Sequence, residues 1–294
     1  MHRSGFVNII GNPNVGKSTL MNALVGEKLS IITSKAQTTR HRIMGIVSGE
    51  DFQIVYSDTP GILKPSYKLQ ESMMKFVTGA LTDADVILYV TDTVEQSERS
   101  AEIVDSIRRS GIPTVVVINK IDLSTPEALE ALVDKWQAEI PGAQVVPTSA
   151  KENFNIEGLF RTILSLLPEG PAFYPKDTLT DKTLRFFASE IIREKMLRLL
   201  DREVPHGVAV GIERWNERED GLVEINAVIY CEKASHKGII IGKRGAMLKE
   251  IGQQARADIE RMLDAKVFLE LWVKVKEGWR NNQYQMRNFG YEEQ

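Results

Sequence analysis

The stretch Gly11-Asn12-Pro13-Asn14-Val15-Gly16-Lys17-Ser18-Thr19 decides the fold of the N-terminal half of the chain. It has the spacing G-x-x-x-x-G-K-S, with an apolar run of strand length before it at residues 6–10 and helical spacing after it. In that context the two glycines let the backbone wrap closely around phosphate groups, and the N–H groups at the helix N-terminus bind the anion. The stretch therefore predicts a strand, a phosphate-binding loop and a helix. We expect Lys17 to reach the outer phosphates and the Ser18 hydroxyl to ligate Mg2+.

Four further apolar runs of strand length follow within the first 170 residues, at 52–56, 86–90, 114–118 and 144–146. Stretches with helical spacing separate several of them. Strands that alternate with helices are typical of βαβ units, in which a mostly parallel sheet is covered on both faces. The first half therefore predicts an α/β fold with a doubly wound sheet around the phosphate-binding loop.

The composition changes between Pro168 and Lys182, where prolines and polar residues predict a linker. After it, the spacing predicts a helix over 184–200, strands over 208–215 and 222–230, and a short helix and an apolar run that lead to Gly242. A long helix to about residue 263 and a strand over 267–275 follow. We therefore expect a nucleotide-binding domain over 1–170, a linker over 171–182 and an α+β domain over 183–294, which ends in a basic and aromatic tail.

The composition is that of an ordinary globular protein and excludes several classes. Hydrophobic residues make up 43% and charged residues 26% of the 294 residues, which excludes a disordered, collagen-like or disulfide-rich chain. One cysteine, Cys231, excludes an internal disulfide and a cysteine-based zinc site. No apolar stretch approaches the roughly 20 residues that cross a bilayer, and the N-terminus leaves no room for a signal peptide. We expect a cytoplasmic monomer.

Two motifs in the first half indicate which base the nucleotide carries. Asn119-Lys120-Ile121-Asp122 follows an apolar strand and has the N-K-x-D arrangement that reads guanine. The Asp122 carboxylate can accept hydrogen bonds from both the ring N–H and the exocyclic amine of guanine, a pair that adenine does not offer. Ser149-Ala150-Lys151 follows the next strand, and the Ala150 N–H is expected to donate to the guanine carbonyl oxygen. These motifs predict GTP and GDP as ligands.

Two other stretches indicate how the terminal phosphate and the metal are held. Asp58-Thr59-Pro60-Gly61 ends a strand; we expect its aspartate to hold Mg2+ through water and the Gly61 N–H to sense the terminal phosphate. Gln37-Thr38-Thr39-Arg40 lies in a loop that is expected to place a threonine on the metal, and we choose Thr39 over Thr38. Each short motif has an alternative as a turn or a helix cap, but four in the correct order, each closing a strand, favour a GTP site.

The residue after the aspartate motif, Ile62, departs from Ras-like proteins, which have there the glutamine that orients the attacking water. An isoleucine has no group for this task, so slow intrinsic hydrolysis is expected. Asn14 is a candidate contributor, because in related GTPases an asparagine at this place helps to bind a K+ ion that replaces an arginine finger; it is equally suited to forming a turn. The residues expected to support hydrolysis are Lys17, Thr39, Gly61 and Asn14.

Residues 239–251 form the informative stretch of the second half, with the sequence IIIGKRGAMLKEI. It matches the KH pattern I-G-x-x-G-x-x-I-x-x-I, with a leucine in place of one isoleucine. Gly242 and Gly245 let the backbone approach a nucleic-acid backbone, and Lys243 and Arg244 are expected to meet phosphates. The flanking order of elements, α-β-β-α-α-β, is the type II arrangement of the KH fold.

Residues 235–289 hold 11 basic and 6 acidic side chains, a local excess that the net charge of −3 conceals. The further cations that we expect to contact RNA are Lys249, Lys274, Lys276 and Arg280. Aromatic residues such as Trp279 and Phe289 lie among them and suit the stacking of single-stranded bases. Packing of a C-terminal helix onto the domain explains them equally well.

These residues together resemble the Era GTPase family over nearly the whole chain. The motifs that carry the resemblance are GNPNVGKST at 11–19, KAQTTRHR at 35–42, DTPGI at 58–62, NKID at 119–122, SAK at 149–151 and HKGIIIGKRGAMLKEIG at 236–252. The resemblance implies a Ras-like GTPase domain joined to a type II KH domain that binds the 3′ end of the small-subunit (16S) ribosomal RNA. It also implies a role in the assembly and maturation of the 30S subunit and a peripheral association with the inner membrane.

Two alternatives belong to other classes of protein. The chain could be a regulatory GTPase that acts on a protein or membrane partner, with a degenerate KH domain, although the intact loop at 242–245 argues against degeneration. It could also be a metabolic kinase with a phosphate-binding loop, but the N-K-x-D motif at 119–122 has no role in such an enzyme. RNA crosslinking tests the first alternative, and a comparison of GTP with ATP binding tests the second.

Overall fold

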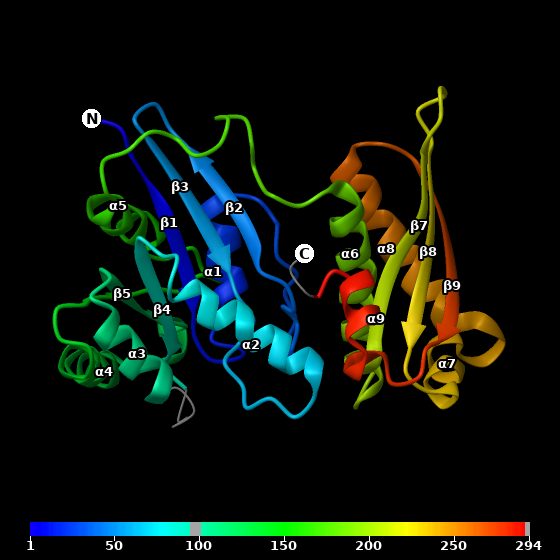
Figure 1. Cartoon of the computed structure of the whole chain (residues 1–294), viewed down its shortest axis with the longest axis horizontal. Coiled ribbons are helices and arrows are strands. Elements are labelled where there is room, and N and C mark those ends of the chain that lie inside the picture. Colours follow the sequence, from blue (N-terminus) through cyan, green and yellow to red (C-terminus); the bar gives the residue numbers. More distant parts are fainter. Residues whose placement is uncertain (95–100, 292–294) are drawn as a thin grey trace. The chain divides into compact units, whose positions relative to one another are not determined.

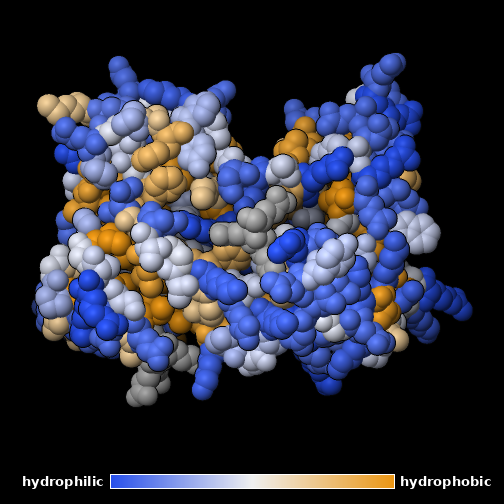
Figure 2. All heavy atoms as spheres, in the orientation of Figure 1, coloured by the Kyte–Doolittle hydropathy of each residue, from blue (hydrophilic) through white to orange (hydrophobic). Residues whose placement is uncertain are grey.

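The computed structural model describes residues 1–94 and 101–291, and Figure 1 shows their course from the N-terminus in blue to the C-terminus in red. The residues form two compact units. The first unit contains Met1–Ser66 and Gln70–Asp181, and the second contains Tyr67–Leu69 and Lys182–Gln294. No helix among the described residues is both long enough and apolar enough to span a bilayer. In Figure 2, hydrophilic side chains cover most of the visible face of the second unit, and hydrophobic side chains show among them on the first.

The first unit contains a six-stranded sheet in the order β2-β3-β1-β4-β5-β6. The strands are β1 (Arg3–Ile10), β2 (Ile43–Ser48), β3 (Phe52–Asp58), β4 (Val86–Asp92), β5 (Thr114–Asn119) and β6 (Gln144–Pro147). All neighbours are parallel except β2, which runs antiparallel to β3. The predicted mostly parallel sheet is confirmed. The sequence did not predict β2, because its mixed run includes Gly45 and lacks the continuous apolar pattern of a doubly covered strand.

Helices cover both faces of this sheet. They are α1 (Lys17–Val25), α2 (Lys68–Ala80), α3 (Ala101–Ser110), α4 (Pro126–Glu139) and α5 (Ile156–Leu166), with a 3-10 turn at Ile121–Leu123. One apolar cluster joins alternate residues of β4 and β5 to the buried sides of α2, α3 and α4. Helix α1 contacts β1, β2, β3 and α5 instead. This two-sided packing is that of a doubly wound α/β fold.

The segment predicted to be a linker lies along the edge strand β2. The Ile46 N–H donates to the Leu179 carbonyl at 2.8 Å, and the Thr180 hydroxyl donates to the Met44 carbonyl at 2.6 Å. The Gln53 side chain accepts from the N–H groups of Phe173 and Tyr174, at 2.7 and 2.9 Å. Residues 173–180 therefore pair with backbone groups that an edge strand would otherwise expose.

The second unit contains a three-stranded sheet in the order β7-β8-β9, in which β7 and β8 are antiparallel and β8 and β9 are parallel. Its elements are α6 (Leu184–Leu199), β7 (Val208–Glu217), β8 (Val223–Cys231), α7 (Ala234–Ile241), α8 (Ala246–Leu263), β9 (Val267–Val275) and α9 (Gln283–Asn288), with 3-10 turns at Val204–Gly207, Lys243–Gly245 and Trp279–Asn281. The order α-β-β-α-α-β confirms the type II KH fold. One face of the sheet packs against α6 and α8 in a single apolar core.

Candidate functional site

The phosphate-binding loop connects β1 to α1, and close contacts require glycine at its bends. Gly16 has φ 98°, and a Cβ there would lie 2.1 Å from the Asn119 side-chain nitrogen. A Cβ on Gly11 would lie 2.1 Å from the Val90 carbonyl oxygen. Helix α1 begins at Lys17 with neither a capping side chain nor an acidic residue in its first turn. Its N–H groups are therefore available to an anion, which the helix dipole also favours.

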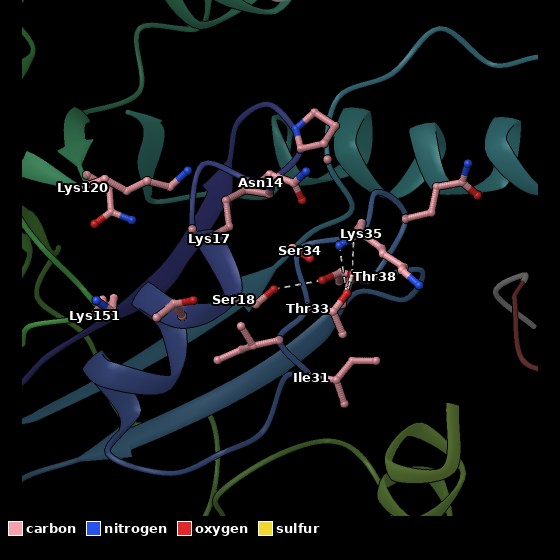
Figure 3. A pocket seen from close by; sticks show the side chains of 18 of the residues that line it. Asn14, Lys17, Ser18, Ile31, Thr33, Ser34, Lys35, Thr38, Lys120 and Lys151 are labelled. Carbon is pink, nitrogen blue, oxygen red and sulfur yellow. Dashed lines mark hydrogen bonds between the residues drawn. The ribbon is translucent and has the colours of Figure 1, made fainter. Parts of the chain in front are cut away.

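A cleft of about 730 Å³ opens above this loop (Figure 3). Most of the predicted site residues line it: Pro13, Asn14, Gly16, Lys17, Ser18, Thr19, Thr39, Gly61, Asn119, Lys120, Asp122, Ser149 and Lys151. The others are buried beneath its surface: Gly11, Asn12, Val15, Asp58, Thr59, Pro60, Ile62 and Ala150. Motif analysis missed most of the opposite wall, which residues 31–35 supply beside Gln37 and Thr38 of the loop expected to reach the metal. Figure 3 shows Thr33, Lys35 and Thr38 on the side of the cleft that faces Ser18.

Three oxygen-bearing side chains meet at one end of the phosphate-binding loop. The Ser18 Oγ donates to Asp58 Oδ2 at 2.6 Å and lies 2.9 Å from the Thr39 Oγ1. Thr38 is not part of this group, because its hydroxyl bonds Thr33 and the Lys35 carbonyl, each at 2.6 Å. Hydroxyl and carboxylate oxygens are the ligands that Mg2+ prefers.

The Asp58 carboxylate has the surroundings of a group that needs a cation. It is fully buried, and its Oδ1 has no hydrogen-bond partner among the described residues. Burial raises the pKa of Asp58, while the hydrogen bond from Ser18 and the charge of Lys17 oppose that rise. Because a buried carboxylate is costly to ionise without compensation, a divalent cation beside Ser18 and Thr39 fits this pocket.

Lys17 lies at the base of the cleft, where its Nζ donates to the Asn12 carbonyl at 2.8 Å. The Asn12 side chain is buried, and its amide atoms have no hydrogen-bond partner among the described residues. Asn14 is exposed at the rim, with a left-handed backbone at φ 66°. That conformation suits a turn, and the exposed carboxamide still lines the cleft, so the geometry is compatible with both interpretations of Asn14.

The residues that follow Asp58 are bonded to the phosphate-binding strand and loop. The Thr59 hydroxyl donates to the Ile9 carbonyl at 2.7 Å, and the Ile62 N–H donates to the Gly11 carbonyl at 3.1 Å. A Cβ on Gly61 would lie 2.8 Å from the Pro13 backbone, so only glycine fits there. The Ile62 side chain is 4% exposed and packs in the apolar core. It therefore offers no polar group to a nucleotide.

A buried carboxamide organises the base side of the cleft. Asn119 donates to the Val15 carbonyl and accepts from the Ala150 N–H, both at 2.9 Å. The Ser149 hydroxyl donates to Asp122 Oδ1 at 2.6 Å and so orients that carboxylate. One detail differs from the prediction. The Ala150 N–H, which the motif predicts to face a guanine oxygen, donates instead to the Asn119 side-chain oxygen.

Motif analysis missed Asp92, which holds the lysine of the N-K-x-D motif. The Lys120 Nζ lies 2.6 Å from Asp92 Oδ2, and the Val94 N–H donates to the other carboxylate oxygen at 3.0 Å. The Thr93 hydroxyl donates to the Lys120 carbonyl at 3.1 Å, where the lysine backbone is left-handed with φ 60°. The sequence signal that could have identified Asp92 is its position at the end of β4, beside Asn119 at the end of the neighbouring strand β5.

The loop between α7 and α8 has the geometry that the G-x-x-G pattern predicts. Gly242 and Gly245 have φ 72° and 80°, and Arg244 is left-handed with φ 53°. A Cβ on Gly242 would lie 2.7 Å from the Met247 Cβ. Lys243 and Arg244 are exposed, so both charges face solvent.

A cleft of about 440 Å³ adjoins this loop and combines apolar with cationic side chains. Its lining residues are Gly245, Leu248, Lys249, Gly252, Gln253, Arg256, Leu269 and Leu271. Lys249 was predicted to bind RNA, and Arg256, two turns further along α8, was missed. Such a cleft suits unstacked bases against the leucines and phosphates against the cations.

The other predicted RNA-binding cations do not lie in this cleft. Lys274 pairs with Glu213 at 3.3 Å, and Arg280 pairs with Glu232. The Lys276 Nζ lies over the rings of Tyr230 and Phe289, at 5.1 and 5.4 Å from their centroids. Their charges are engaged within the protein, which weakens the case for contact with RNA phosphates.

Trp279 packs inside the second unit and is not a stacking platform. It is fully buried, and its Nε1 donates to the Gly207 carbonyl at 3.0 Å. It contacts the rings of Phe289 and Tyr291, with centroids 5.4 and 5.7 Å away. Of the two interpretations of the C-terminal aromatic residues, packing holds for Trp279.

Comparisons with known proteins agree with both halves. A family model described as a 50S ribosome-binding GTPase matches residues 6–120, and one described as a KH domain matches residues 203–280. The GTPase Era of Clostridium kluyveri is 47% identical over 292 residues, which cover 99% of this chain and 100% of that one. The GTPase Era of Ruminiclostridium cellulolyticum is 45% identical over 291 residues, which cover 99% and 98%.

Solved structures extend the similarity to the fold of the whole chain. A crystal structure of Era in complex with MgGDPNP and nucleotides 1506–1542 of 16S ribosomal RNA has a TM-score of 0.96 and 41% identity, with complete coverage of both chains. A variant of Aquifex aeolicus Era bound to GDP·AlF4− has a TM-score of 0.95 and 41% identity, covering 99% of this chain and 100% of that one. The chain therefore belongs to the Era GTPase family.

Proposed function

We propose that this chain is a GTP-hydrolysing switch that binds the 3′ end of 16S ribosomal RNA and assists assembly and maturation of the 30S subunit. The observation that carries the proposal is the single cleft that combines an uncapped α1 N-terminus with the oriented Asp122 carboxylate. A phosphate chain fits the first and a guanine edge fits the second. The relatives named GTPase Era, and the Era structure with MgGDPNP and RNA, support the same function.

In the proposed site, Ser18 and Thr39 hold Mg2+ directly and Asp58 holds it through water. The ion would neutralise negative charge on the outer phosphates. Lys17 adds a fixed positive charge at the same place, and the Gly61 N–H donates to the terminal phosphate. Because Ile62 is buried and apolar, no side chain there orients the attacking water, which supports slow intrinsic turnover. We assign a K+ site to Asn14 as the further source of positive charge during hydrolysis.

The proposed RNA site consists of the loop at 242–245 and the adjoining cleft with Lys249. The exposed Lys243 and Arg244 support contact with phosphates, and the intact glycines argue against the alternative of a degenerate domain that serves only a protein or membrane partner. A ribosomal RNA partner implies a cytoplasmic location. Peripheral association with the inner membrane and a monomeric state stay predictions.

Asp122→Asn should exchange the preferred base. An asparagine amide can donate to the oxygen that xanthine carries in place of the guanine amine, so the variant should prefer xanthosine triphosphate and lose GTP affinity by on the order of 100-fold or more. Titration of both proteins with both nucleotides measures this. ATP serves as the control for a general loss of the site, and an unchanged preference for GTP contradicts the assignment.

Asp92→Ala should loosen the bound nucleotide without changing the choice of base. The variant removes the carboxylate that holds Lys120, and we expect GDP to dissociate about tenfold faster, equivalent to roughly 1.4 kcal/mol. Stopped-flow release of a fluorescent GDP measures the rate. Asp134→Ala, at an exposed position of α4, is the matched control. Equal release rates for the two variants would exclude a role for Asp92 in positioning Lys120.

Turnover should rise when K+ replaces Na+, and loss of the Asn14 carboxamide should flatten that response. Asn14→Gly is the appropriate variant, because glycine keeps the left-handed backbone at φ 66° that alanine would strain. Single-turnover hydrolysis in the two salts, with GTP affinity measured alongside, tests both statements. Equal rates of the unaltered protein in K+ and Na+ would end the K+ proposal.

Lys243→Asp with Arg244→Asp should abolish most RNA binding while leaving GTP affinity intact. The glycines fix the shape of the loop, and aspartate tolerates the left-handed position of Arg244. Loss of two phosphate contacts should make the salt dependence of binding shallower by roughly 1.4 in slope, at about 0.7 per contact. RNA titrations over a salt series measure it.

The matched control for this variant is Arg185→Asp with Lys266→Asp, which makes the same charge change at exposed positions of the second unit. Lys266 lies beyond the far end of α8, whose 18 residues span roughly 27 Å from the loop. If RNA affinity survives in the loop variant, the KH site is refuted and a protein partner becomes the better explanation.

A further inference from the structure

A second serine lies close to the proposed metal site, in the loop that connects α1 to β2. Ser30 is fully buried, and its Oγ has no hydrogen-bond partner among residues 1–94 and 101–291. The Asp58 Oδ1 has the same two properties. A buried polar atom without a partner carries a desolvation cost, and an ion or a water molecule is a common reason for its presence.

The Asn22 side chain fixes the backbone of Ser30 to α1. Its Oδ1 accepts from the N–H groups of Leu29 and Ser30, at 3.0 and 2.9 Å, and its Nδ2 donates to the Ser30 carbonyl at 2.8 Å. Asn22 follows Ser18 by four residues, so the two side chains lie on the same face of α1. Ser30 is therefore held about one helical turn from the hydroxyl that is proposed to ligate Mg2+.

The surroundings of Asp58 place the Ser30 hydroxyl beside that carboxylate. Burial raises the pKa of Asp58, and four side chains oppose the rise: Ser18, Lys17, Ser30 and Thr39. Ser18 donates to Oδ2 at 2.6 Å, so Oδ1 is the oxygen without a donor among the described residues. The Ser30 Oγ is near Asp58 without the geometry of a direct hydrogen bond, an arrangement in which a water molecule can bridge two polar groups.

A water ligand of Mg2+ has the hydrogens that these two atoms require. Mg2+ gives up its waters reluctantly and keeps several of them in protein sites. Each such water can donate two hydrogen bonds, and a carboxylate oxygen and a hydroxyl oxygen both accept. Asp58 Oδ1 would accept the first and Ser30 Oγ the second. Groups that surround the direct ligands in this way orient them and raise the affinity for the metal.

We propose that Ser30 is a positioning residue of the Mg2+ site, whose hydroxyl shares a water ligand of the ion with Asp58 Oδ1. The inference rests on the proposed function, because it requires Mg2+ to accompany the bound nucleotide. Ser30 acts through that water and touches neither the ion nor the nucleotide. Because the Asn22 carboxamide already fixes the Ser30 backbone, the hydroxyl is in place before the ion binds.

Ser30→Ala should weaken the binding of Mg2+ and leave the binding of the nucleotide alone unchanged. Release of a fluorescent GDP from the full chain, over a series of Mg2+ concentrations, gives the concentration that produces half of the slowing. We expect this midpoint to rise roughly tenfold. In excess EDTA the variant and the unaltered chain should release GDP at the same rate. An unchanged midpoint overturns the proposal, and so does an acceleration in EDTA as large as that in Mg2+.

Two further variants separate the hydroxyl from the space that it fills. Ser30→Cys fills the same space, but a thiol is a weak donor and acceptor, so its Mg2+ midpoint should match that of Ser30→Ala. A midpoint equal to that of the unaltered chain would assign the effect to packing and overturn the proposal. Ser4→Ala is the matched control, since Ser4 is also buried and donates to the Pro171 carbonyl at 2.6 Å. It should leave the midpoint unchanged.

Asp58→Ala shows whether the two oxygens act on the same water. If they do, adding Ser30→Ala to this variant should raise the Mg2+ midpoint by less than about twofold, because effects on one shared partner do not add. A further tenfold rise would mean that Ser30 acts independently of Asp58 and would overturn the proposal. If the unaltered chain binds no GDP, or releases it at one rate whatever the Mg2+ concentration, the proposed GTP site itself fails and this inference fails with it.

Discussion

The nucleotide cleft depends on one buried side chain, the carboxamide of Asn119. It binds the Val15 carbonyl in the phosphate-binding loop and the Ala150 N–H in the loop after β6. Its nitrogen also lies so close to Gly16 that no other residue fits there. Both functional groups of the amide are hydrogen-bonded, so neither carries the desolvation cost of an unsatisfied buried polar group. Loops from three strands are thus held in one geometry, and Asp122 projects from the same short segment that Asn119 begins.

Most other parts of the cleft lie where a parallel strand ends. Asp58 ends β3, Asp92 ends β4, and the phosphate-binding loop follows β1. Open α/β sheets bind ligands outside the carboxyl ends of their strands, because the loops there converge while the sheet stays rigid. Only residues 31–39 come from outside this set, and they supply Thr39 to the proposed metal site. This loop meets the phosphate-binding loop through the Thr39 hydroxyl, which lies 2.9 Å from the Ser18 hydroxyl. It is therefore the part of the cleft most able to respond to the nucleotide.

The structural features that depend only on neighbouring residues could be predicted from the sequence. Continuous apolar runs predicted β4 and β5, and glycine spacing predicted both loops, because backbone closeness at Gly16 or Gly242 leaves no alternative residue. Strand β2 was missed, since an antiparallel edge strand needs no continuous apolar run. Asp92 was missed because its role depends on the register that places it beside Asn119. The pairing of Lys274 with Glu213 joins residues 61 positions apart, which charge counting along the chain does not detect.

Positive charge in the second unit is concentrated around the G-x-x-G loop, where residues 234–263 hold six Lys or Arg and three Asp or Glu. The pI of about 5.9 gives no sign of this local excess, because acidic residues elsewhere in the chain offset it. The Debye length at physiological salt is about 8 Å, so a phosphate at the loop is largely screened from acidic residues that lie farther away. A chain with a net charge of −3 can therefore still attract a polyanion to one short segment.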